Sequence, residues 1–258
     1  MRPSVRTGVR EMCEETSRLA ALDTLDTSVH VWRASLVSTT SSLLLMERTL
    51  SADERERGAR YRFARDRARY IVARGTLRAI LARYLGMAPA EVRFVYGPHG
   101  KPALAPEHGG DDTLSFNLSH ADDRSLSAVT RGRRVGIDIE RVAPDIATST
   151  VAEHTFSPRD IAALRALPPQ QQPDAFFRCW TRKEAYVKAV GAGFSLDLRG
   201  FDVSLAPGDP PALLATQPDP HEAARWSLHD VDAEPGYLAA LAVEGQAVVR
   251  VRDITDPV

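Results

Sequence analysis

Hydrophobic and polar positions in the first half of the chain predict a strand, a long helix and further strands. Residues 29–36 (VHVWRASL) are rich in β-branched and aromatic side chains, as strands are. Residues 50–86 have apolar side chains at helical spacing, with Ser51 and Glu54 as a capping box and Gly86 at the end. Four further strands are predicted, over 91–96, 114–119, 126–130 and 135–140.

The second half repeats this order of elements. Ser157, as the N-cap before Pro158, begins a helix over 157–167, and a longer helix over 173–191 begins at Asp174 and ends at Gly191. Strands are predicted over 201–205, 225–231 and 237–243. The pattern indicates an α+β protein with two α+β halves, residues 29–132 and 133–258, after an N-terminal extension over 1–28.

Composition excludes several classes of protein. The chain has 258 residues and a net charge of −1, which favours neither nucleic acid nor a membrane surface as a partner. Its apolar runs are far shorter than the roughly 20 residues of a membrane span. The first residues lack the apolar segment of a secretory signal, and Cys13 and Cys179 form no metal-binding or disulfide pattern. We therefore expect a cytoplasmic globular protein.

Two carboxylates lie two positions apart in the strand segment VGIDIE. Asp138 and Glu140 share one face, whereas Ile137 and Ile139 share the other. Adjacent like charges are stabilised by a cation, and oxygen ligands favour a hard one such as Mg²⁺ or Mn²⁺. The alternative is an ordinary solvent-facing edge strand.

The helix over 173–191 carries a row of polar and aromatic side chains. Trp180, Glu184 and Lys188 lie at i, i+4 and i+8, along one face. Glu184 and Lys188 could form a simple surface ion pair, but arginine would serve as well there. The chain has only three lysines among 33 basic residues, and lysine, unlike arginine, releases a proton readily. This bias suggests proton transfer to a leaving phosphate oxygen.

Three other segments carry candidate binding residues. Lys101 lies in the turn segment YGPHGKPAL, and Ser119 and His120 end the strand segment FNLSH. Ser119 and His120 face opposite ways, so phosphate contacts are more natural for them than a nucleophile–base pair; a capping serine and a structural histidine are the alternative. Residues 55–74 hold eight arginines, which indicate a solvated helix face, a nucleic-acid patch or a cradle for a polyphosphate ligand.

Together these segments resemble the 4′-phosphopantetheinyl transferases of the long, surfactin-synthetase-activating (Sfp) type. The resemblance covers about residues 29–245, and GIDIE followed by WTRKEAYVK is its specific part, whereas an isolated D-x-E is not. The matching segments are RYRFARDRARYIVARGTLR, YGPHGKP, FNLSH, VGIDIE, FSPRD and FFRCWTRKEAYVKAVGAGF.

The resemblance implies a pseudodimer of two similar halves with coenzyme A in the cleft between them. Such enzymes transfer phosphopantetheine from coenzyme A to a serine of an apo acyl or peptidyl carrier protein and release adenosine 3′,5′-bisphosphate. By position, Asp138, Glu140 and Glu184 would hold Mg²⁺, with Mn²⁺ as the alternative. Glu184 would also act as general base, directly or through a water. Lys188 would neutralise the pyrophosphate and protonate the departing bisphosphate.

The same resemblance implies contacts to coenzyme A from several basic and polar residues. The residues at the matching positions are Arg57, Arg69, Lys101, Ser119 and His120, together with Lys188. The chain departs from the family pattern in three places: Glu54 replaces a basic residue, Tyr70 a threonine and Asp160 a frequent glutamate. These departures bear on the phosphate contacts and leave the metal ligands unaffected.

Two other functions compete with this interpretation. A metal-dependent nuclease usually carries its acid and lysine two apart on a strand, whereas Glu184 and Lys188 are four apart in a helical pattern. A non-catalytic carrier-binding module would have lost Glu184, Lys188 or the Asp138/Glu140 pair, and all are present. Because both halves of the cleft lie in one chain, we expect a monomer that binds neither nucleic acid nor membrane.

Overall fold

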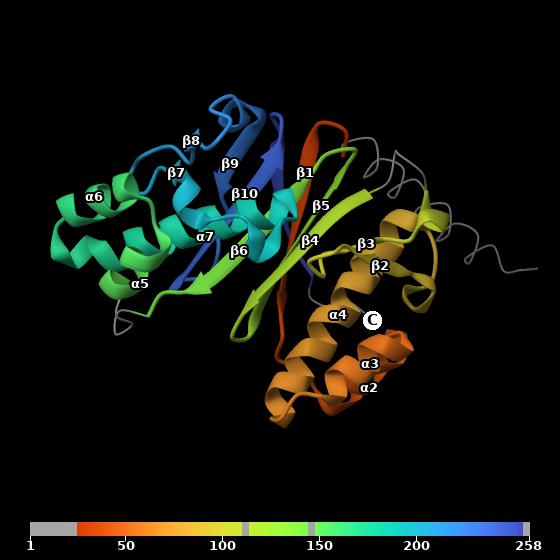
Figure 1. The fold of residues 1–258 in the computed structure, drawn as a ribbon. Coiled ribbons are helices and arrows are strands. Elements are labelled where there is room, and N and C mark those ends of the chain that lie inside the picture. Colours follow the sequence, from red (N-terminus) through yellow and green to blue (C-terminus); the bar gives the residue numbers. More distant parts are fainter. Residues whose placement is uncertain (1–24, 110–113, 144–147, 255–258) are drawn as a thin grey trace, which may run out of the picture.

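The computed structural model describes residues 25–109, 114–143 and 148–254 (Figure 1). The first half contains β1 (Ser28–Ser35), α2 (Thr40–Thr49), α3 (Ala52–Ala59), α4 (Ala64–Leu85), β2 (Phe94–Tyr96), β3 (Pro102–Leu104), β4 (Leu114–Ala121) and β5 (Arg124–Arg131). The second contains β6 (Val135–Arg141), α5 (Thr148–Thr155), α6 (Pro158–Ala166), α7 (Gln172–Val190), β7 (Phe201–Val203), β8 (Leu213–Thr216), β9 (Trp226–Asp230), β10 (Tyr237–Glu244) and β11 (Val248–Asp253). The α+β class is confirmed.

The two main sheets have matching strand orders. The first runs β11-β1-β5-β4 and the second β6-β10-β9. In each half the first strand, β1 or β6, pairs with the second strand of a later antiparallel pair, β5 of β4–β5 or β10 of β9–β10. β11 comes from the end of the chain but pairs in parallel with β1, in the sheet of the first half. The boundary at residue 132 and the pseudodimer symmetry stay predictions.

The two sheets meet along β4 and β6. No backbone ladder joins these strands, but the Asn117 side chain of β4 accepts a hydrogen bond from the Ile137 N–H of β6 at 2.8 Å. Behind this contact one hydrophobic cluster joins Val29 and Leu126 of the first sheet to Ile139 and Leu241 of the second. The halves therefore share a core.

Helices cover the opposite faces of this core. α4 packs against the first sheet through Leu77, Ile80 and Leu81, with α2 and α3 beside it. α7 lies across β6 and β10 near the centre of Figure 1, and α5 and α6 lie at its N-terminal end. No helix among the described residues is long and apolar enough to span a bilayer.

The single helix predicted over 50–86 is wrong, because the chain breaks between α3 and α4. Phe63 adopts an extended conformation (φ −103°, ψ 134°) as the N-cap of α4. The break lets α3 fold back so that Glu54 forms ion pairs with Arg74 and Arg78 at 2.5 and 2.7 Å, with all three side chains buried. A continuous helix would carry Glu54 away from both arginines, so tertiary contacts override the local pattern.

Other predicted boundaries differ less. Ser157 caps α6, and Gly86 and Gly191 end α4 and α7 with φ of 69° and 78°, as predicted. Asp174 lies in the first turn of α7 and Gln171 is the cap, because a short 3-10 turn over 169–171 leads into the helix. α2, α5, β3, β8 and β11 were not predicted. Cys13 and most of the 1–28 extension lie outside the described residues.

Candidate active site

β6 and α7 lie unusually close together because Gly136 has no side chain. A Cβ built there would lie 2.1 Å from the Ala185 carbonyl oxygen and 2.3 Å from the Ala189 nitrogen. Asp138 and Glu140 follow Gly136 on the same face of β6, toward α7. Ile137 and Ile139 face the shared core, as the alternation predicted. This close packing brings the carboxylates of β6 next to the row formed by Trp180, Glu184 and Lys188 on α7.

Three side chains from three elements form a hydrogen-bonded triangle at this junction. The Lys188 ammonium of α7 lies 2.6 Å from Asp138 Oδ1 and donates to Ser119 Oγ at 3.0 Å. Ser119 of β4 in turn donates to the same Asp138 oxygen at 2.9 Å. Burial raises the pKa of Asp138, and the Lys188 charge opposes this. The triangle ties the polar row of α7 to both sheets.

Glu140 and Glu184 belong to the same electrostatic group. Burial, followed by the Asp138 charge, raises the pKa of Glu140 to about 7, and Trp180 donates a hydrogen bond to its carboxylate. Burial and the Asp138 charge also raise the pKa of Glu184. Each carboxylate therefore lies within electrostatic range of Asp138, and a nearby cation would favour the charged form of all three.

The carboxylates of Asp138, Glu140 and Glu184 are the kind of ligand that a hard cation prefers, but they are not arranged as a coordination shell. Asp138 Oδ2 is buried and has no hydrogen-bond partner, so it is free to accept a metal ion. However, among the residues that the structure describes, no three acidic, histidine or cysteine side chains are close enough together to hold a metal as they stand. Metal binding by Asp138, Glu140 and Glu184 stays a prediction that requires side-chain movement.

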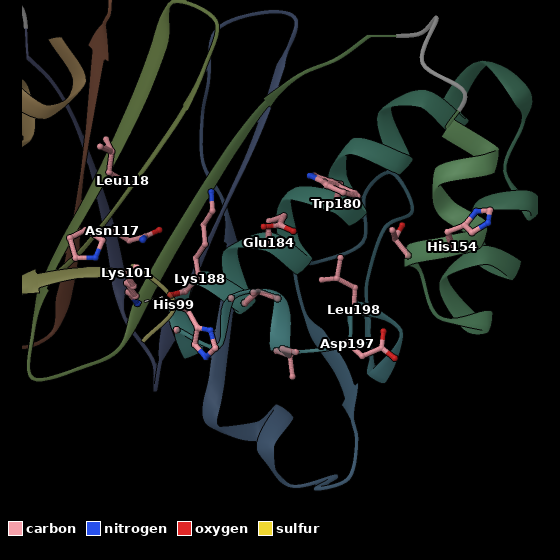
Figure 2. A pocket seen from close by; sticks show the side chains of 17 residues that line it. His99, Lys101, Asn117, Leu118, His154, Trp180, Glu184, Lys188, Asp197 and Leu198 are labelled. Atoms are coloured by element: carbon pink, nitrogen blue, oxygen red, sulfur yellow. Dashed lines mark hydrogen bonds between the residues drawn. The ribbon is translucent and has the colours of Figure 1, made fainter. Parts of the chain in front are cut away.

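A cavity of about 560 Å³ opens beside α7. Trp180, Glu184 and Lys188 lie along one wall of it, in the order that their helical spacing predicted (Figure 2). Other labelled lining residues come from both halves of the chain: His99, Lys101, Asn117, Leu118, His154, Asp197 and Leu198. The cavity is thus a cleft shared by the two halves, with both charged and apolar walls.

Two of the three lysines have a structural reason to be lysine, whereas proton transfer by Lys188 stays a prediction. Lys183 is completely buried, where its ammonium lies 2.7 Å from Asp160 and donates to the carbonyls of Leu198 and Phe201. Lys101 donates to the carbonyls of Val135, Lys188 and Ala189 at 3.1, 2.5 and 3.2 Å. In both cases three acceptors converge on one nitrogen, which an ammonium satisfies and a planar guanidinium does not.

Lys101 therefore has its three donors occupied by backbone oxygens. Burial, together with the Arg134 charge, lowers its pKa to about 8. Ser119 is likewise engaged, within the triangle described above. Partial desolvation of the ring, together with the charges of Lys188 and Arg69, lowers the pKa of His120, although the residue keeps solvent-exposed surface. The contacts of Lys101, Ser119 and His120 with coenzyme A stay predictions.

The arginine-rich segment 55–74 is less positive than its sequence suggested. Five of its arginines pair with acidic side chains: Arg60 with Glu56, Arg65 with Asp66, Arg67 with Glu47, Arg69 with Asp123 and Arg74 with Glu54. A second cavity of about 430 Å³ is bordered by basic, aromatic and acidic side chains: Arg57, Arg60, Tyr70, Tyr96, Asp53, Glu54 and Glu56. Gly100, which lies between β2 and β3, borders both cavities.

Sequence reasoning missed three contributors to the site. Asn117 lies two residues before Ser119 on the same face of β4, so the strand period could have identified it. Gly136 precedes Asp138 by the same interval. His154 lines the cavity from α5, a helix that was not predicted.

Comparison with known proteins gives a consistent result. Residues 134–242 match the family model described as the 4′-phosphopantetheinyl transferase superfamily, and residues 32–130 match the model of a 4′-phosphopantetheinyl transferase N-terminal region. The 4′-phosphopantetheinyl transferase HetI of Nostoc sp. is 40% identical over 87% of this chain and 91% of its own length. The transferase Sfp of Bacillus subtilis is 28% identical over 74% of this chain and 81% of its own.

Similarity to solved structures is weaker. The holo-[acyl-carrier-protein] synthase of Helicobacter pylori, solved in complex with coenzyme A, aligns with 43% of this chain and 99% of its own. The TM-score is 0.34 at 19% sequence identity, which carries no argument about this site.

Proposed function

The chain belongs to the 4′-phosphopantetheinyl transferase superfamily and is an enzyme of its Sfp-like type, and we propose that it transfers phosphopantetheine from coenzyme A to a serine of an apo acyl or peptidyl carrier protein. The proposal rests on the side chains that α7 contributes to the wall of the cleft. There Glu184 and Lys188 lie side by side along one cavity, and Asp138 lies directly beneath Lys188. The second product is adenosine 3′,5′-bisphosphate.

The reaction exchanges one phosphorus–oxygen bond for another. The carrier serine oxygen bonds to the phosphorus that bears pantetheine, and the bond from that phosphorus to the bridging pyrophosphate oxygen breaks. Glu184 accepts the serine proton, directly or through a water, since its carboxylate lines the cleft beside Lys188. Lys188 neutralises the departing bisphosphate and donates a proton to it, and its place on α7 opposite Ser119 holds it within the cleft.

We assign the metal to Asp138, Glu140 and Glu184. Mg²⁺ bound there would neutralise the pyrophosphate charge during transfer. The buried and unpartnered Asp138 Oδ2, together with the raised pKa values of the two glutamates, supports this assignment.

Coenzyme A is proposed to lie along both cavities, since Gly100 borders the two of them. Arg57 borders the second cavity, and His120 lies within electrostatic range of both Lys188 and Arg69, so Arg57, Arg69 and His120 are proposed phosphate contacts. Asp53 and Glu56 also border that cavity, so a phosphate placed there needs Arg57 and Arg60 to outweigh them. We further propose that the enzyme acts as a cytoplasmic monomer and that arginines of 55–74 attract an acidic carrier.

Intact-mass analysis of an apo carrier protein tests the proposal. Incubated with the enzyme, coenzyme A and Mg²⁺, the carrier should gain the mass of one phosphopantetheine. EDTA or Glu184→Gln should abolish the gain, whereas Glu107→Gln, at an exposed position away from the cleft, should leave it unchanged. Coenzyme A binding without any transfer to acyl or peptidyl carriers would instead favour the non-catalytic carrier-binding module. Hydrolysis of DNA or RNA in place of transfer would favour the nuclease.

A further inference from the structure

The turn between β2 and β3 contacts the C-terminal end of α7. Residues 97–101 form this turn, which we call the β2–β3 turn. Its His99 side chain packs over Gly193, where an added Cβ would come within 2.9 Å of His99 Cβ. Its Lys101 stem packs over Gly191, with Cδ 3.5 Å from the position of an added Cβ. The turn belongs to the first half of the chain and α7 to the second.

The Lys101 ammonium completes the hydrogen bonding at this helix end. The last four carbonyls of a helix lack partners within the helix. Gly191 N–H satisfies the Val187 carbonyl at 2.9 Å, and Lys101 satisfies the next two, those of Lys188 and Ala189. A positive charge is also favoured there, because the C-terminal end of a helix is the negative end of its dipole.

The same ammonium also bonds to the first residue of β6. Val135, whose carbonyl lies 3.1 Å from Lys101 Nζ, begins the strand that carries Asp138 and Glu140. Lys188, whose carbonyl lies 2.5 Å away, places its own ammonium on Asp138. One side chain from the first half thus joins the two elements that hold the carboxylates and lysine of the proposed site.

We propose that Lys101 is a positioning residue: its ammonium binds carbonyls at the end of α7 and the start of β6, and so holds Lys188 over Asp138. We call these three contacts the clasp. The same ammonium is then not a ligand of coenzyme A. The part that concerns turnover rests on the proposed function. A phosphate contact would require Lys101 to abandon three partly buried carbonyl oxygens, and leaving such acceptors without partners is costly. The geometry also explains why this position is lysine in an arginine-rich chain.

The experiment compares Lys101→Met and Lys101→Arg with the unchanged enzyme in the full-length protein. Hydrogen–deuterium exchange of the coenzyme A-free protein reports on the end of α7, calorimetry gives the coenzyme A Kd, and carrier loading gives kcat and KM. Arg93→Met is the matched control, since it removes an exposed positive charge just before β2. Thermal unfolding verifies that each variant is folded.

The clasp predicts faster exchange over 187–193 in Lys101→Met, with a coenzyme A Kd within about threefold of normal. A displacement of Lys188 on the order of 1 Å should lower kcat by about tenfold to a hundredfold, with little change in KM for coenzyme A. Lys101→Arg should not restore kcat, although it keeps the charge. Should Lys101→Met fail to fold, the exchange, Kd and kcat of Lys101→Arg decide by the same criteria.

Three results would overturn the proposal: unchanged exchange at the end of α7, faster exchange with normal kcat, or a coenzyme A Kd raised tenfold or more and restored by arginine. The last would make Lys101 a phosphate ligand. If the unchanged enzyme loads no carrier, the proposed function fails, and the exchange result alone then decides whether the clasp exists.

Discussion

Replacing Gly136 with alanine should separate α7 from β6 and disable the site. The added Cβ would lie 2.1 Å from the Ala185 carbonyl, and real contacts of this kind do not fall below 3.0 Å. Because the opposing atoms belong to the helix backbone, they cannot rotate away, and α7 must move by about 0.9 Å or more. That movement would lengthen the 2.6 Å contact between Lys188 and Asp138.

Two effects of known size follow from this displacement. Overpacking a well-packed core costs about 1–3 kcal/mol, and for a chain of this length that lowers Tm on the order of 3–9 °C. A misplacement of about 1 Å at a site of positioned groups costs about a hundredfold in rate. We therefore expect Gly136→Ala to remain folded, with a lower Tm and a kcat reduced by about two orders of magnitude.

Differential scanning calorimetry and the carrier-loading assay measure the two effects. Gly200→Ala is the matched control, because a Cβ there meets no atom within 4 Å and Gly200 has no positive φ. Its Tm and kcat should stay near those of the unchanged enzyme. Wild-type kcat in Gly136→Ala would refute the reasoning, since it would mean that the close approach of α7 does not position the site.

Three other predictions concern stability and can be measured by urea unfolding. Glu54→Gln should cost about 3 kcal/mol, because it leaves two buried arginines without their carboxylate; a loss below 1 kcal/mol would show that the ion pairs contribute little. Asn117→Ala should cost about 1–3 kcal/mol by leaving the buried Ile137 N–H unpaired, and an unchanged midpoint would contradict this. Burial, with the charges of Arg252 and Arg250, lowers the pKa of His30 from 6.5 to about 4. Between these pH values the unfolded chain therefore binds more protons than the folded one. The free energy of unfolding should fall as pH drops from 6.5 to 4. His30→Gln should flatten that fall by about 2–3 kcal/mol, and an equally steep fall in the variant would exclude His30 as its cause.

Local pattern predicted most of the strands and the ends of the long helices. β6 was located by its alternation, and the end of α7 by Gly191, because both signals arise within a few residues. α2 and α5 lack such a signal. The break between α3 and α4 escaped prediction because it is stabilised by the contact of Glu54 with two arginines at least 20 residues away.

For the candidate site, the sequence by itself determined which chemical groups share a face. The strand period paired Asp138 with Glu140, and the helical period aligned Trp180, Glu184 and Lys188, since both periods follow from backbone geometry alone. The tertiary structure alone decided which groups meet. Lys188 contacts Asp138 across 50 residues, and Lys101 reaches the Lys188 carbonyl across 87. Such contacts depend on how the two halves pack, which short-range periodicity does not encode, so only the fold could place Lys101 at a helix end.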